Sequence, residues 1–264
     1  MLSPQLEQRV WRPAGLVLAV LVILIGAGQA WGALTEQTES EPTQVLGPIS
    51  ALDLDLDDAS ARISPGAEGQ VGIQQNLDWT FRRPVVEQTL IGRLLRIKVR
   101  CPSILGVGEP TCSVALSINV PRATAVTVRL SSGSAKVSGL SGELSLRSSS
   151  GSIELDGDSG RISAHSTSGQ IQGQGLTSQD VETTLTSGQL SLGFTAPPAR
   201  VAVSATSGEA DLTVPPGSTY RVTTHTASGG GVDRDPGLDD PQSSRSITVS
   251  TTSGHASLAY SSTG

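Results

Sequence analysis

The chain has 264 residues, and its 18 lysine and arginine side chains against 24 aspartate and glutamate side chains give a formal net charge of −6. An acidic chain without a concentrated basic stretch is not expected to bind nucleic acid. Aromatic residues make up only 3% of the sequence, so a sugar-binding face built from exposed rings is not expected either. Sugar contacts made through hydrogen bonds stay open.

The start of the chain predicts a membrane anchor. Residues 1–12 are polar and contain Arg9 and Arg12, and a long apolar run follows them. About 20 apolar residues in a helix cross a bilayer, so residues 13–34 are predicted to form one transmembrane helix. The positive-inside rule then leaves residues 1–12 as a cytoplasmic tail and places the C-terminal domain outside the plasma membrane. The alternative is a cleaved signal peptide with a small-x-small site at Gly28-Gln29-Ala30.

The next two segments differ from the rest of the chain in composition and in apolar patterning. Residues 35–47 are acidic, contain proline and threonine, and lack an apolar period, which predicts a linker. Residues 48–120 predict a β-rich cap, because a bare solenoid end would expose an unpaired strand edge. The strands expected within the cap are Ala51–Asp57, Gln70–Phe81, Thr89–Arg100 and Ser113–Val120.

Residues 121–264 are punctuated by a hydroxyl residue followed by glycine. The first five such glycines, Gly133 to Gly169, are nine residues apart, and later ones stand further apart. Apolar residues follow in pairs spaced by two, so both members of a pair point to one face of a strand. Equivalent pairs recur after about 18–20 residues. This pattern predicts a β-solenoid, with two short strands in each coil and Ser/Thr-Gly corners between them.

The apolar ladder expected inside the coils consists of Ile153, Ile171, Leu190, Leu192, Leu212, Val201 and Val203. We expect Leu192 to lie between the positions of Gly173 and Leu212 in the neighbouring coils. The alternative fold is an antiparallel β-sandwich meander of nine-residue units. The solenoid is favoured because the apolar pairs keep their register over steps of one coil.

Two smaller expectations concern the same domain. Glu143 and Arg161 are 18 residues apart and carry opposite charges, so stacked coils would pair them on the surface. The segment Gly229–Ser244 interrupts the repeat with glycine, aspartate and proline, which predicts a surface loop inserted into a late coil.

The two cysteines are the clearest chemical pair. Cys101 and Cys112 flank a loop rich in proline and glycine, between two expected strands. Outside the membrane they would oxidise to a disulfide, which stabilises a loop of this length by about 3 kcal/mol. There is no Cys-x-x-Cys motif and the three histidines are dispersed, so neither a metal site nor a cofactor is expected.

Two further patterns have a chemical interpretation that we weigh and set aside. The acidic residues of the late loop are weak calcium candidates: Asp233, Asp235, Asp239 and Asp240. Gly157–Gly160 resembles the nucleophile motif of trypsin-like proteases, but Arg161 stands where that family has a further glycine. No matching histidine context is present for it, and we do not expect an enzyme.

Four short sequence segments resemble those of a known family: Ser150–Leu155, Thr206–Leu212, Val120-Pro121 and Val214-Pro215. The chain resembles the putative adhesin family of unknown function, which is widespread in bacteria, over residues 48–260. The resemblance implies an exported β-solenoid-like domain behind an N-terminal membrane segment. It implies no catalytic residues.

The hypothesis from the sequence is a membrane-anchored, extracytoplasmic, adhesin-like protein that binds or scaffolds without catalysis at the cell envelope. Its partner would be an envelope protein or polymer. The alternative is the ectodomain of an accessory protein in envelope-stress sensing and regulation. A polysaccharide-active β-helix enzyme is less favoured, because such an enzyme needs carboxylates that converge on one face. The acidic residues of the repeats fall in different registers: Glu143, Glu154, Asp156, Glu182 and Glu209.

Overall fold

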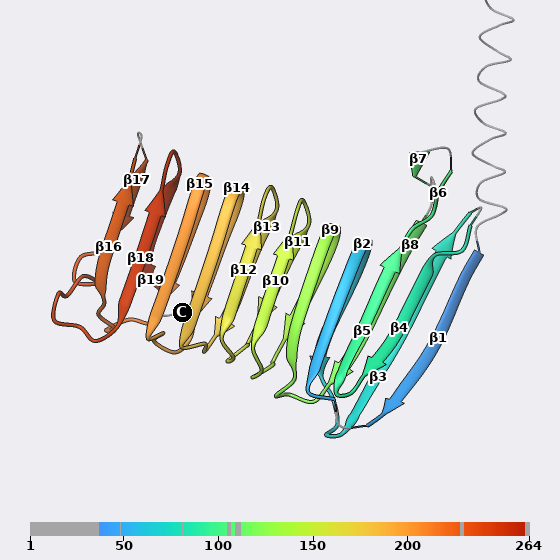
Figure 1. The fold of residues 1–264 in the computed structure, drawn as a ribbon. Helices are drawn as coiled ribbons and strands as arrows, with labels where there is room; N and C mark the ends of the chain where they lie inside the picture. Colours follow the sequence, from blue (N-terminus) through green and yellow to red (C-terminus); the bar gives the residue numbers. More distant parts are fainter. Residues whose placement is uncertain are drawn as a thin grey trace, which may run out of the picture.

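The computed structural model describes residues 37–47, 49–80, 82–104, 107–108, 112–227 and 230–261. Every regular element in these ranges is a β-strand, which confirms the predicted all-β class (Figure 1). None of the described segments is a helix long and apolar enough to cross a membrane. The predicted transmembrane helix at residues 13–34 and the predicted tail before it lie outside the described residues.

The strands in chain order are β1 (Gln37–Leu46), β2 (Ala51–Pro65), β3 (Gln70–Trp79), β4 (Val85–Ile91), β5 (Leu94–Arg100), β6 (Ser103–Ile104), β7 (Val107–Gly108), β8 (Cys112–Val120), β9 (Ala125–Ser138), β10 (Leu144–Ser148), β11 (Ser152–Asp156), β12 (Ile162–Ser166), β13 (Gln170–Leu176), β14 (Asp180–Phe194), β15 (Arg200–Val214), β16 (Arg221–Thr226), β17 (Gly231–Arg234), β18 (Ser246–Thr251) and β19 (His255–Tyr260). All but β6 and β7 stand side by side in a long row in two layers, and β6 and β7 form a separate hairpin that projects from it (Figure 1).

The middle of the row is a stack of parallel coils. Leu144 of β10 lies opposite Ile162 of β12, a step of 18 residues, and Val181 of β14 lies opposite Val201 of β15. The nine-residue units therefore do not pair as an antiparallel meander. The long strands β9 and β14 bend through a corner and serve both layers. As a result β9, β10, β12, β14, β13 and β11 form a closed ring of parallel pairings.

The inside of the stack holds the apolar ladder. All seven ladder residues named above are buried, with at most 1% of their surface exposed. Leu192 lies opposite Gly173 on one side and opposite Leu212 on the other. One coil alone could not bury its apolar face, so these rows of side chains across coils are the core.

The corners require glycine because successive coils approach closely there. A Cβ on Gly151 would lie 2.5 Å from the carbonyl oxygen of Gly133, which is the corner glycine of the preceding coil. Gly169, Gly188 and Gly208 meet the coil before them in the same way. The repeated hydroxyl-glycine pair thus reflects a column of backbone contacts along the stack.

At the N-terminal end, part of the predicted cap is itself a coil. β2 pairs in parallel with β9 along both layers, from Ala51 opposite Ala125 to Ile63 opposite Val137. Its other edge pairs with β5 and β8. Beyond these the direction reverses: β4 is antiparallel to β5, β3 to β8, and β1 to β3.

At the C-terminal end, spatial order also departs from chain order. β18 and β19 lie between β15 on one side and β16 and β17 on the other. The segment 229–244 is therefore not simply a loop, because it contains β17 within the outermost coil. The turn after β17 folds back and buries Leu238 beside Tyr220, whose backbone N–H donates to the Leu238 carbonyl.

Candidate functional site

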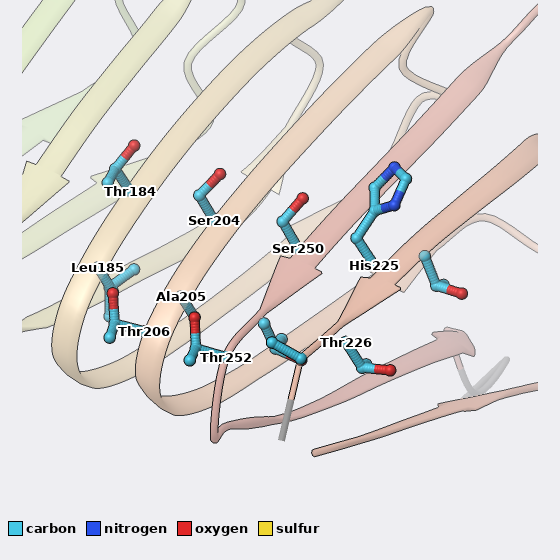
Figure 2. Close-up of a pocket in the computed structure, with 12 residues that line it drawn as sticks. Thr184, Leu185, Ser204, Ala205, Thr206, His225, Thr226, Ser250 and Thr252 are labelled. Atoms are coloured by element: carbon cyan, nitrogen blue, oxygen red, sulfur yellow. The ribbon is translucent and has the colours of Figure 1, made fainter. Parts of the chain in front are cut away.

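A surface groove of about 580 Å³ crosses the last coils in the stacking direction (Figure 2). We call it the hydroxyl groove. One row of its side chains consists of Thr184, Ser204, Ser250 and His225, and a second row contains Thr206 and Thr252. These residues come from four neighbouring strands, β14, β15, β18 and β16, and from the corners that follow them.

The register of the strands creates the rows. Thr184 lies opposite Ser204, and Ser204 lies opposite Ser250. Neighbouring strands are about 4.8 Å apart, so the row presents one hydroxyl at each step of that length. The second row lies two residues further along each strand and faces the same way. The strand register therefore fixes the spacing of these side chains along the groove.

The chemistry of the lining is hydrogen bonding. Hydroxyl groups both donate and accept hydrogen bonds. Among the described residues that line the groove, His225 is the only titratable side chain and none carries a carboxylate. At the floor, Thr251 is buried and its hydroxyl has no hydrogen-bond partner within the described structure. Such a lining can hold polar groups through several hydrogen bonds.

The first row continues beyond the groove as a basic row. Thr184 lies opposite His165, and His165 lies opposite Arg147. Both side chains are exposed on the outer face of the preceding coils. An extended ligand in the hydroxyl groove that continues along the same row would therefore pass Arg147, which could contact an acidic group.

The structure joins Cys101 and Cys112 by a disulfide, with their Cα atoms 6.1 Å apart. The bond connects the chain just after β5 to the start of β8 and closes the segment that contains the β6–β7 hairpin. It lies towards the N-terminal end of the stack, several coils away from the hydroxyl groove (Figure 1).

The four calcium candidates do not form a common site. The Asp233 carboxylate is 3.4 Å from His255, and the Asp235 carboxylate accepts a hydrogen bond from the backbone of Tyr260. Asp239 pairs with Arg234 at 3.0 Å, and Asp240 accepts from the backbone of Gln242. Within the described ranges, no group of three or more such side chains could hold a metal ion. Each aspartate instead fixes a turn or an adjacent strand.

The protease-like motif forms a corner of the stack. The Asp158 side chain is fully buried, and its carboxylate accepts hydrogen bonds from the backbone N–H groups of Leu140 and Asp156, at 2.8 and 3.2 Å. Burial is the main cause that raises the pKa of Asp158 to about 6. Ser159 is exposed and donates to the backbone carbonyl of Leu140. Asp158 thus ties neighbouring coils together.

The protein family called Toastrack DUF4097 matches residues 116–262 of this chain. The chain belongs to this family. That result agrees with the resemblance to putative adhesins seen in the sequence. No match was found among the curated proteins.

Three solved structures are similar to this Toastrack chain. A putative adhesin from Bacteroides fragilis has a TM-score of 0.47 at 9% identity, covering 84% of this chain and 97% of the other. A putative cell adhesion protein from Clostridium sporogenes has a TM-score of 0.39 at 13% identity, covering 85% and 100%. A putative lipid binding protein from Parabacteroides distasonis has a TM-score of 0.40 at 12% identity, covering 86% and 97%.

Sequence reasoning did not find the hydroxyl groove of the Toastrack domain, although a signal for it exists. A hydroxyl residue stands two positions before another one at three successive corners: Thr184-Leu185-Thr186, Ser204-Ala205-Thr206 and Ser250-Thr251-Thr252. The third of these lies far along the chain, after the segment that forms the outermost coil. Only the observed strand order places it next to the second.

Proposed function

We propose that this protein is a non-enzymatic binding module of the cell envelope that holds an extended polysaccharide along the hydroxyl groove. The observation that carries the proposal is the alignment of Thr184, Ser204 and Ser250 on successive strands beside the second row. A polysaccharide chain repeats its hydroxyl groups along its length, as the groove repeats its own. Each hydrogen bond contributes only modestly, so affinity would come from several aligned contacts.

The proposal places the domain outside the plasma membrane, held by a single helix at residues 13–34 with the N-terminus in the cytoplasm. Arg9 and Arg12 before the apolar run support this orientation. The disulfide between Cys101 and Cys112 supports an oxidising compartment, because cytosolic thiols are usually kept reduced. No cofactor is needed for binding of this kind.

The absence of a convergent acid pair in the groove supports binding over catalysis. A glycosidase positions two carboxyl groups on either side of the scissile bond. None of the residues that line the hydroxyl groove has a carboxyl group. A polysaccharide could lie there, but the lining would not cleave it.

The test is a binding assay of the full chain against purified envelope polysaccharides. The double variant Thr206→Val and Thr252→Val keeps side-chain shape and removes two hydroxyl groups, so we expect affinity to fall about tenfold or more. Ser191→Ala is the matched control, since Ser191 is exposed on a different strand segment, outside the groove. It should bind like the unmodified chain.

Two results would contradict the proposal. One is unchanged polysaccharide binding by the double variant. The other is the absence of polysaccharide binding by the unmodified chain while a pull-down from envelope fractions recovers a protein partner. The second result would assign the stack to protein scaffolding instead.

A further inference from the structure

The first row of the hydroxyl groove continues beyond the groove at both ends. Strand pairing extends it over the preceding coils through three basic positions, which are His165, Arg147 and Arg129. At the other end the row reaches His225, which lies opposite Ser250. Paired residues on neighbouring parallel strands point the same way, so all of these side chains lie on one outer face of the stack. The hydroxyl groups of the groove therefore stand between basic side chains.

Hydroxyl groups also continue beyond the groove on the side of the second row. Ser149 and Thr167 stand two residues after Arg147 and His165, and both are exposed. They follow the ends of β10 and β12, at the corners of the earlier coils. A ligand that leaves the groove in this direction therefore still meets hydrogen-bonding side chains beside the basic positions.

Arg147 differs from its basic neighbour in its partners. It is exposed, and among the described residues no carboxylate forms an ion pair with it. Arg129, one coil away, has its guanidinium 2.6 Å from the carboxylate of Asp53, which neutralises its charge. A guanidinium can bind a carboxylate or a phosphate through two parallel hydrogen bonds. Arg147 therefore adds an anion-binding group to a row of hydroxyl groups.

The two layers of the stack differ in charge along this row. From β9 to β16 the first row contains no carboxylate among its described residues. The corresponding row on the outer face of the other layer contains one basic residue, Lys136, and three acidic ones: Glu154, Asp211 and Asp233. The whole chain is acidic, with a formal net charge of −6. An acidic ligand is therefore repelled by the other layer and directed to the face that carries the groove.

We infer that the hydroxyl groove takes an acidic polysaccharide, which carries carboxylate or phosphate groups along its chain. This ligand class rests on the proposed function, because the same groove holds the polymer. Hydroxyl groups of the polymer bond to the first row within the groove, while an acidic group bonds to Arg147. Arg147 is two strand steps from Thr184, or about 10 Å, so the acidic group belongs to a sugar unit beyond the groove.

Glu182 is an acidic residue that lies next to the first row on this face. It is exposed and stands two residues before Thr184, on the side of the row away from Thr206 and Thr252. The polymer therefore lies on the side of the second row, where none of the described lining residues carries a carboxylate. The Glu182 charge still opposes a nearby acidic group, although only weakly, because water screens exposed charges. Its removal should strengthen the binding of an acidic polymer.

The first experiment measures binding of the full chain to polygalacturonate and to its fully methyl-esterified form. Both forms offer the same sugar hydroxyl groups, but only the first is negatively charged. We expect polygalacturonate to bind about tenfold tighter at low salt, and the difference to shrink at high salt. Poly(glycerol phosphate) is the third probe, and the tighter of the two acidic polymers identifies the acidic group as carboxylate or phosphate. If neither binds more tightly than the ester, the ligand is not acidic and the assignment is wrong.

The second experiment uses three single variants. Arg147→Gln should weaken polygalacturonate binding about tenfold and leave binding of the ester unchanged. Glu182→Gln should strengthen polygalacturonate binding about twofold. Arg62→Gln is the matched control, since Arg62 is exposed on the other layer and the change in net charge is the same as for Arg147→Gln. It should bind like the unmodified chain, and equal losses from both arginine variants would overturn the assignment.

The double variant Thr206→Val and Thr252→Val separates this ligand class from the proposed function. It should weaken binding of both forms of the polymer, because both use the hydroxyl groups of the groove. If it weakens both while Arg147→Gln changes neither, the groove holds a polysaccharide but the acidic class is wrong. If the double variant changes neither, the groove does not hold the polymer and the proposed function fails as well.

Discussion

At the C-terminal end of the stack, the outermost strands β16 and β17 are polar, and the turn after them folds back over the core with Leu238 fully buried. At the N-terminal end, β1 covers one layer, but β4 in the other layer leaves Leu90 and Ile91 exposed. Both ends have to terminate the same kind of core. The first covers its core within one chain, whereas the second leaves large apolar side chains of β4 in contact with solvent.

The two ends share one device that the regular middle lacks. β2 lies between β9 and the β5–β8 coil, and β18 and β19 lie between β15 and the outermost coil. The last two strands, β18 and β19, are therefore held inside the stack, as is β2, whereas β1, which precedes β2 in the chain, lies at the N-terminal tip. Stability in stacked repeats is a sum of terms between neighbours, so this placement gives β2, β18 and β19 neighbours on both sides instead of one.

The largest effect should separate the two ends directly. Leu238→Ala opens a cavity under the C-terminal turn and should lower the free energy of unfolding by about 2–5 kcal/mol. Leu90→Ala at the N-terminal end should cost only roughly 1 kcal/mol, because half of that side chain is already in water. Denaturant unfolding of the two variants measures both losses. If both variants lose the same free energy of unfolding, the two ends do not differ in how well they cover the core.

A second prediction concerns Asp158, which lies between the ends. Burial raises the pKa of its carboxyl to about 6 from 3.8. The folded chain therefore keeps this proton up to about pH 6, while the unfolded chain releases it near pH 4. The resulting stability is complete below pH 4 and is lost as the pH rises to about 6. Two pKa units correspond to about 3 kcal/mol.

Comparison with Asp158→Asn isolates this contribution. The variant has no titrating group but keeps an oxygen that can accept from Leu140. Between pH 4 and pH 7 the unmodified chain should lose about 3 kcal/mol more stability than the variant. Unfolding in denaturant at the two pH values gives the difference. Parallel pH profiles of the two proteins would exclude a raised pKa at Asp158.

Much of the middle of the stack could be predicted from the sequence. The corner glycines and the apolar pairs gave the register that places Leu192 between Gly173 and Leu212. This works because each coil contacts its neighbours through the same positions, so a local pattern repeats in space. The expected disulfide also forms, since Cys101 and Cys112 are close in sequence and flank neighbouring strands.

The ends and the groove could not be predicted in the same way. The pairs Val222–Thr224 of β16 and Ile247–Val249 of β18 have equivalent sequence patterns. The local sequence therefore does not indicate which of these two strands pairs with β15. The hydroxyl groove depends on that order. The burial of Asp158 has no local signal in the sequence, because its carboxyl group is held by backbone donors that only the folded coils bring together.

The smallest predicted effect concerns an ion pair on the surface of the middle. Arg161 was expected to pair with Glu143, but its guanidinium lies 3.4 Å from Asp180 on the following coil instead. The Arg161 side chain is 52% exposed, so solvent screens the interaction. A double-mutant cycle with Arg161→Ala and Asp180→Ala should give a coupling of at most about 1 kcal/mol. A coupling several times larger would show a tighter pair than the structure describes.

The stacking of coils is the basis for both the groove and the contrast between the ends, and one crosslink tests it directly. The backbone N–H of Leu144 donates to the carbonyl of Arg161, so positions 143 and 161 face each other on neighbouring coils. The double variant Glu143→Cys and Arg161→Cys should form an intramolecular disulfide on mild oxidation. If that pair stays reduced while Glu143→Cys with Ser152→Cys closes, the nine-residue units pair with each other and the stack is wrong.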